Sequence, residues 1–139
     1  MANAYNGEID IELYGKRYPM KINMGVIAEF QSETNCDYMH VAISAMNAFN
    51  QSIEMSAFQR AEVLTKAIPM ANAAWLFYLA AKEMDSMVTF EEIQEAVLNE
   101  GPMTIMDEGD EVRQSYPLLF TNLVMFATLG ITDAAKKPQ

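Results

Sequence analysis

Cys36 and His40 are the first residues whose chemistry could matter, because they are the only thiol and the only imidazole in the chain. A spacing of four residues would place both on one face of a helix, as a nucleophile with its base or as two metal ligands. However, Asp37 is a good helix N-cap, so Cys36 precedes the helix that would carry His40. A structural zinc ion also needs four such ligands. We therefore expect neither a catalytic pair nor a metal site here.

Carboxylates are the other groups that could do chemistry. The acidic run at 107–111 lacks the alternating acids, central glycine and terminal glutamate of a twelve-residue calcium loop. Glu91, Glu92 and Glu95 fall in the first turns of a predicted helix, where the helix dipole favours acids for stability alone. The six glycines are scattered and form no phosphate-binding loop. We therefore expect no catalytic residue and no cofactor, and we predict that the protein is not an enzyme.

The negative charge of the chain is concentrated in one segment. The 139 residues include 19 acids and nine bases, which gives a net charge of −10. Ten of the acids and none of the bases lie between Glu83 and Glu111, so the remaining nine acids balance the nine bases. Nucleic acids and anionic membranes bind clustered Lys and Arg, so we expect neither as a partner. A solvated acidic face over an ordinary core would explain the same pattern.

Methionines accompany these acids. Four of the twelve lie in the same segment, and methionine serves either as a filler of irregular cores or as an adaptable contact for partners. We therefore predict that a partner binds around Met84, Met87, Met103 and Met106, together with Glu91 and Glu95.

The elements that must position these residues begin with a β-hairpin at about 8–23. Apolar and polar residues alternate on both sides of Gly15-Lys16, as in two half-buried strands. Folding about that dipeptide predicts the pairs Leu13 with Tyr18, Ile11 with Met20 and Ile9 with Ile22, and sets Asp10 opposite Lys21. Pro19 has no N–H to donate, so we expect its strand to be an edge.

After the hairpin the apolar period changes to about 3.6, which predicts five or six helices. Capping boxes are expected at Ser56 with Gln59 and at Thr89 with Glu92, and Pro69 either kinks one helix or starts the next. The expected helices run from Met24 to near Asn35, from Asp37 to 47–50, from Ser56 to Ile68, from Met70 to Met84, from Thr89 to Asn99 and from Pro117 to Leu129. Residues 101–110 are expected to form an acidic loop.

Apolar positions within these helices predict the core. The helix opened by Ser56 carries Phe58, Ala61, Leu64 and Ile68 as its apolar residues. The last helix is expected to bury Leu119, Leu123, Val124 and Ala127, and to end with Gly130 as its C-terminal cap.

The predicted fold class is mainly α, with α+β at the margin. We expect a single helical domain over residues 1–139, with the hairpin at about 8–23, a helical body at about 24–130 and a flexible tail at 131–139. The longest uncharged apolar run, 73–81, is less than half of the roughly 20 residues that a membrane span needs. With one cysteine and no recognisable secretion signal, we expect a cytoplasmic protein.

The order of elements and several short phrases resemble a known family. The hairpin 11–22 leads into Gly25-Val26-Ile27-Ala28-Glu29-Phe30-Gln31-Ser32-Glu33-Thr34, and later come Leu76-Phe77-Tyr78-Leu79-Ala80-Ala81 and Thr89-Phe90-Glu91-Glu92-Ile93. This layout, over residues 8–129, resembles the small tail assembly chaperones of long-tailed bacteriophages and of gene transfer agents. The chain departs from the family at Asn35, where the family often has Gly.

The resemblance implies a non-enzymatic protein of the host cytoplasm. Such chaperones bind the tape-measure protein, a long apolar helical rod, and keep it soluble while tail-tube subunits are recruited. Two other functions remain open, namely a structural tail or connector subunit of the virion and an acidic protein that mimics nucleic acid and inhibits a host enzyme. Self-association into a homo-oligomer also remains open.

Overall fold

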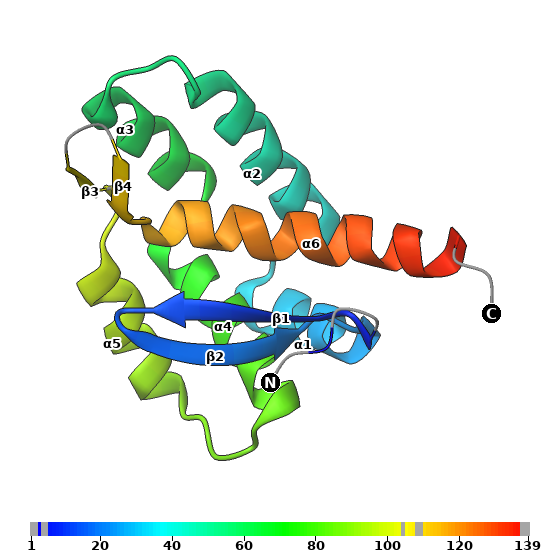
Figure 1. Cartoon of the computed structure of the whole chain (residues 1–139). Helices are drawn as coiled ribbons and strands as arrows, with labels where there is room; N and C mark the ends of the chain where they lie inside the picture. Colours follow the sequence, from blue (N-terminus) through cyan, green and yellow to red (C-terminus); the bar gives the residue numbers. More distant parts are fainter. Residues whose placement is uncertain (1–2, 4–5, 104, 108–109, 137–139) are drawn as a thin grey trace.

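The computed structural model describes residues 3, 6–103, 105–107 and 110–136, and the side chains of residues 3, 6–103 and 114–128. The fold is mainly α with an N-terminal β-hairpin, as predicted, and it has six helices within the described residues. The elements in chain order are β1 (Glu8–Leu13), β2 (Lys16–Lys21), α1 (Met24–Thr34), α2 (Tyr38–Ser52), α3 (Ala57–Ala67), α4 (Met70–Met84), α5 (Phe90–Glu100), β3 (Ile105–Asp107), β4 (Asp110–Arg113) and α6 (Tyr116–Lys136) (Figure 1).

The register of the hairpin differs from the prediction by two residues. Strand β1 pairs antiparallel with β2 so that Leu13 lies opposite Lys16 and Ile11 opposite Tyr18. Tyr14 and Gly15 both have positive φ, 45° and 85°, which closes a two-residue turn that fits the twist of the strands. The predicted pairs, including Asp10 with Lys21, are therefore wrong. Because the shift is even, the same apolar side chains still face the core.

Pro19 occupies a position that tolerates its missing N–H. It lies opposite Asp10, and counting outward from the two-residue turn makes this a pair without ladder hydrogen bonds. In the described part of the chain β1 and β2 form a sheet of two strands only, so β2 is an edge, as expected.

The predicted caps of the helices are mostly confirmed. Asn35 ends α1 in the left-handed conformation, with φ 56° and ψ 31°. Both capping boxes form: Ser56 with Gln59 opens α3, and Thr89 with Glu92 opens α5. Pro69 directly precedes α4, so it starts that helix rather than kinking α3. The second helix extends further than predicted, to Ser52.

Two predictions near the C-terminus are wrong. Strands β3 and β4 pair antiparallel within the segment expected to be a loop, and they are too short to show a clear alternation. Helix α6 continues through Gly130 to Lys136, although Gly130 was expected to cap it. A glycine inside a helix costs only about 1 kcal/mol relative to alanine, so it does not force an end. Residues 131–136 are therefore helical, and 137–139 lie outside the described residues.

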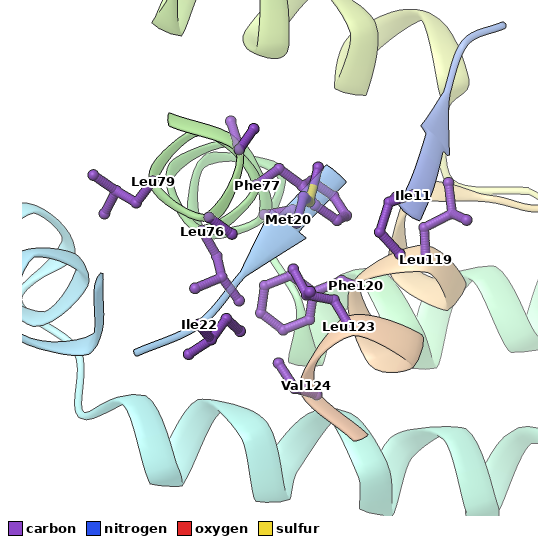
Figure 2. Packing of buried hydrophobic residues seen from close by; sticks show 14 of the residues in the cluster. Ile11, Met20, Ile22, Leu76, Phe77, Leu79, Leu119, Phe120, Leu123 and Val124 are labelled. Carbon is purple, nitrogen blue, oxygen red and sulfur yellow. The ribbon is translucent and has the colours of Figure 1, made fainter. Parts of the chain in front are cut away.

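Helix α4 is central to the core. It packs against β2, α1, α5 and α6, and the hairpin lies across it (Figure 1). Phe77 of α4 meets Phe120 of α6 edge to face, with ring centroids 6.1 Å apart, beside Met20 of β2 (Figure 2). The predicted core residues of α6 are buried. Phe58 at the start of α3 is not, since 78% of it is exposed, so its place in the apolar face was predicted wrongly.

Candidate partner-binding groove

The start of α5 is fixed to the hairpin through one carboxylate. Oε1 of Glu92 accepts the backbone N–H of Thr89 at 3.0 Å, which completes the capping box. Its Oε2 accepts the hydroxyl of Tyr18 at 2.9 Å and forms an ion pair with Nζ of Lys16 at 3.2 Å. The Thr89 N–H and the Tyr18 hydroxyl lower the pKa of the Glu92 carboxyl group. Glu92 therefore joins α5 to a strand whose Tyr18 lies 74 residues earlier in the chain.

Aromatic packing sets the position of α5 against α4. The ring of Phe90, the first residue of α5, lies 4.3 Å from the ring of Trp75 and 5.6 Å from that of Tyr78, both on α4. Ile93 and Val97 of α5 are fully buried on the same side of the helix. These contacts hold α5 in one position relative to α4, and a hollow lies between the two helices.

That hollow is a groove between α4 and α5 with a volume of about 620 Å³. It is lined by Met70, Ala71, Ala74, Glu91, Gln94, Glu95 and Leu98. The α5 residues recur every three or four positions, so they form one stripe along the helix. Leu98 lies at the groove with 62% of its surface exposed, so its side chain is accessible to a partner. The α4 wall is made of small or flexible apolar side chains.

Two of the three polar side chains that line the groove are carboxylates. Glu91 and Glu95 are both exposed, and neither has an ion pair within the described residues. The groove therefore combines apolar contact area, one side-chain amide and two carboxylates. Such a surface suits an apolar segment that also carries positive charge.

The structure brings together two of the six predicted partner residues. Glu91 and Glu95 both line the groove, whereas Met84, Met87 and Met103 do not. Met87 is 81% exposed in the connection from α4 to α5, next to the half-buried Met84 at the end of α4. Met103 is half-buried beyond the other end of α5. Met106 lies in β3, and its side chain is outside the described residues.

Sequence reasoning missed the apolar part of the groove. Met70, Ala71, Ala74 and Leu98 were absent from the prediction, and so was Gln94. Leu98 does carry a local signal, because Ile93, Ala96 and Val97 define the buried side of an amphipathic helix and Leu98 falls outside it. The α4 residues carry no such signal, since α4 is apolar nearly all round.

Cys36 and His40 lie in different environments. Sγ of Cys36, which precedes α2, donates to the carbonyl of Thr34 at 3.4 Å and accepts the side-chain N–H of Asn72 at 3.9 Å. His40 is exposed on α2. Asp37 is the N-cap residue, but its side chain makes no capping hydrogen bond. Within the described residues no three His, Cys, Asp or Glu side chains gather as a metal ion would require.

Comparisons with known proteins give no match, whether with family models, with curated sequences or with solved structures. Among the described residues, no single helix is long and apolar enough to cross a membrane. Helices α3 and α4 meet those criteria only as a pair, which is bent by 68°.

Proposed function

We propose that this protein is a non-enzymatic tail assembly chaperone that binds an apolar helical segment of a tape-measure protein and helps recruit tail-tube subunits around it. The sequence resemblance described above suggests this function. The observation that carries it is the groove between α4 and α5, with Leu98 exposed beside the apolar side chains of α4. An apolar client helix would bury that surface and would stay in solution through the acidic exterior.

The size of the groove defines what it can contribute. Covering an aliphatic side chain such as Leu98 gains about 1 to 2 kcal/mol. A volume near 620 Å³ is that of a site for a small ligand or a few side chains, whereas a stable protein interface buries about 1,600 Å² in total. The groove therefore acts as the anchor point of a longer contact along α5, toward the exposed Met87.

The test is coexpression with the tape-measure protein encoded beside this one. Replacing Leu98 by Ser should reduce the soluble, co-purifying client several-fold, because it removes the apolar anchor. The matched control is Ile53→Ser, since Ile53 is an aliphatic residue of similar exposure, 57%, that does not line the groove. Ile53→Ser should keep the client soluble.

A second variant tests the groove without removing apolar surface. Ala71 is exposed and lines the groove, so Ala71→Trp should fill it and displace the client. The proposal is wrong if the client remains bound to both the Leu98→Ser and the Ala71→Trp proteins while both variants are folded. Finding the protein in purified particles would instead indicate a structural tail subunit.

A further inference from the structure

We infer that the segment bound by this groove is a basic amphipathic helix, in which two Lys or Arg residues four positions apart lie on the same side as a bulky apolar residue. The inference rests on the proposed function for the identity of the client, but its chemistry comes from the charge and geometry of the groove.

The spacing of the groove residues on α5 suits a helical ligand. Glu91 and Glu95 are four residues apart, so their side chains are neighbours on one side of the helix, with their Cβ atoms about 6 Å apart. Leu98 follows three residues later on the same stripe. A helix lying along α5 repeats its own side chains at the same interval, so basic residues four apart can meet the two acids while an apolar residue meets Leu98.

The two acids of the groove form no ion pair within the part of the chain that the structure describes. Glu92, between the two groove acids, is paired with Lys16, but Glu91 and Glu95 have no such pair within the described residues. No Lys or Arg occurs between Glu83 and Glu111 in the sequence. An acidic or neutral helix would leave both carboxylates unpaired beside a newly buried apolar surface, whereas a basic helix would pair them.

The experiment compares two synthetic helical peptides of 20 residues. Each has a central Leu and, on the same side of the helix, two residues at three and seven positions from it, which are Lys in one peptide and Glu in the other. Fluorescence anisotropy with the full-length chain gives the Kd at 50 mM and 300 mM NaCl. The Lys peptide should bind about tenfold tighter than the Glu peptide at low salt, and the preference should shrink at high salt.

Two double variants locate the effect. The Glu91→Gln/Glu95→Gln protein should lose most of the preference for the Lys peptide. The control is Glu29→Gln/Glu33→Gln on α1, which removes an exposed pair with the same four-residue spacing and changes the net charge equally. This control should keep the preference. An equal loss in both variants, or no preference in the unmodified protein, would overturn the inference.

The two proposals fail in different ways. If Leu98→Ser releases the tape-measure protein but neither salt nor the Gln variants affect its binding, the basic-helix inference is wrong and the chaperone function stands. If the Lys peptide binds at Glu91 and Glu95 but the tape-measure protein does not bind, the chaperone function is wrong and the chemistry of the groove stands.

Discussion

The two sides of α5 use the same residue types for different purposes. On the side of the hairpin, both oxygens of Glu92 are occupied by Thr89, Tyr18 and Lys16. On the side of the groove, Glu91 and Glu95 have no ion pair within the described residues. Acids that are adjacent in the sequence therefore differ in role, because a step of one position turns a side chain about 100° around the helix.

Apolar residues of α5 show the same division. Ile93 is fully buried in the core, whereas Leu98 is 62% exposed beside the groove. Burial on one side supplies the stability of the helix, and exposure on the other leaves a surface for a partner. Variants that affect one side and spare the other test this separation.

The largest expected difference is between Ile93→Ala and Leu98→Ala. Ile93→Ala should lower the free energy of unfolding by about 2 to 5 kcal/mol, because it leaves a cavity in a packed core. Leu98→Ala should change it by less than about 0.5 kcal/mol, because little of Leu98 is buried. Urea denaturation followed by circular dichroism measures both values. Similar losses in the two variants would mean that Leu98 supports the fold and is no free surface.

A smaller effect is expected from the capping box. Thr89→Ala should cost about 1 kcal/mol, because the N–H of Glu92 loses its acceptor at the start of α5. Glu95→Gln lies beyond the first turn and should cost less than about 0.5 kcal/mol. The same denaturation experiment compares them. If Glu95→Gln is as costly as Thr89→Ala, the separation of the two sides of α5 is wrong.

Much of the side of α5 that faces the hairpin was predictable from the sequence. Thr89 and Glu92 are a local motif, and the helical spacing of Ile93, Ala96 and Val97 is visible in the sequence. The hairpin register was not predictable in the same way. It depends on a two-residue turn in which Tyr14 adopts a positive φ, and nothing in the sequence indicates that conformation for a tyrosine. The strands β3 and β4 were missed because three or four residues carry too little periodicity.

The groove was only half predictable. Charge along the chain identified Glu91 and Glu95, since a run of acids without bases is visible in any sequence. Met70 and Ala74 join them only because Phe90 packs on Trp75 and fixes how α5 crosses α4. That crossing is a tertiary contact between two helices, and no local pattern in either helix encodes it.

Two tyrosines extend the comparison to hydroxyl groups. The hydroxyl of Tyr18 donates to Glu92, whereas that of Tyr38 is buried without a hydrogen-bond partner. Tyr18→Phe should therefore cost about 0.5 to 1.5 kcal/mol at pH 7, and Tyr38→Phe should be neutral or slightly stabilising. Thermal or urea denaturation of the two variants measures this. A clear loss of stability for Tyr38→Phe would show that its hydroxyl has a partner.

Tyr38 also gives a prediction for the stability of the protein at high pH. Burial raises the pKa of Tyr38 from 10.0 to about 12. The hydroxyl of Tyr38 therefore ionises more readily in the unfolded chain than in the folded protein. The contribution of the neutral Tyr38 to stability is fully present below pH 10 and is lost as the pH rises through 12. Tyr38→Phe should therefore lose less stability than the unmodified protein between pH 10 and 12. Parallel losses for the two proteins would contradict this account.

The smallest expected effect is the dependence of the Glu92 junction on acid. The pKa of Glu92 is lowered by its hydrogen bonds from Thr89 and Tyr18 and by Lys16. Because this pKa is lowered on folding, the charged Glu92 carboxylate contributes stability above the unfolded pKa, near 4.5. That contribution is lost as the pH falls through the folded pKa. Glu92→Gln removes the charge, so it should be less stable than the unmodified protein at pH 7, by less than about 1 kcal/mol. The difference should shrink as the pH falls through the lowered pKa of Glu92, because both proteins are then neutral at this position. Urea midpoints of the two proteins, measured from pH 7 to pH 3, test this prediction. A difference that stays constant over this range would mean that packing, and not the charge of Glu92, holds the hairpin against α5.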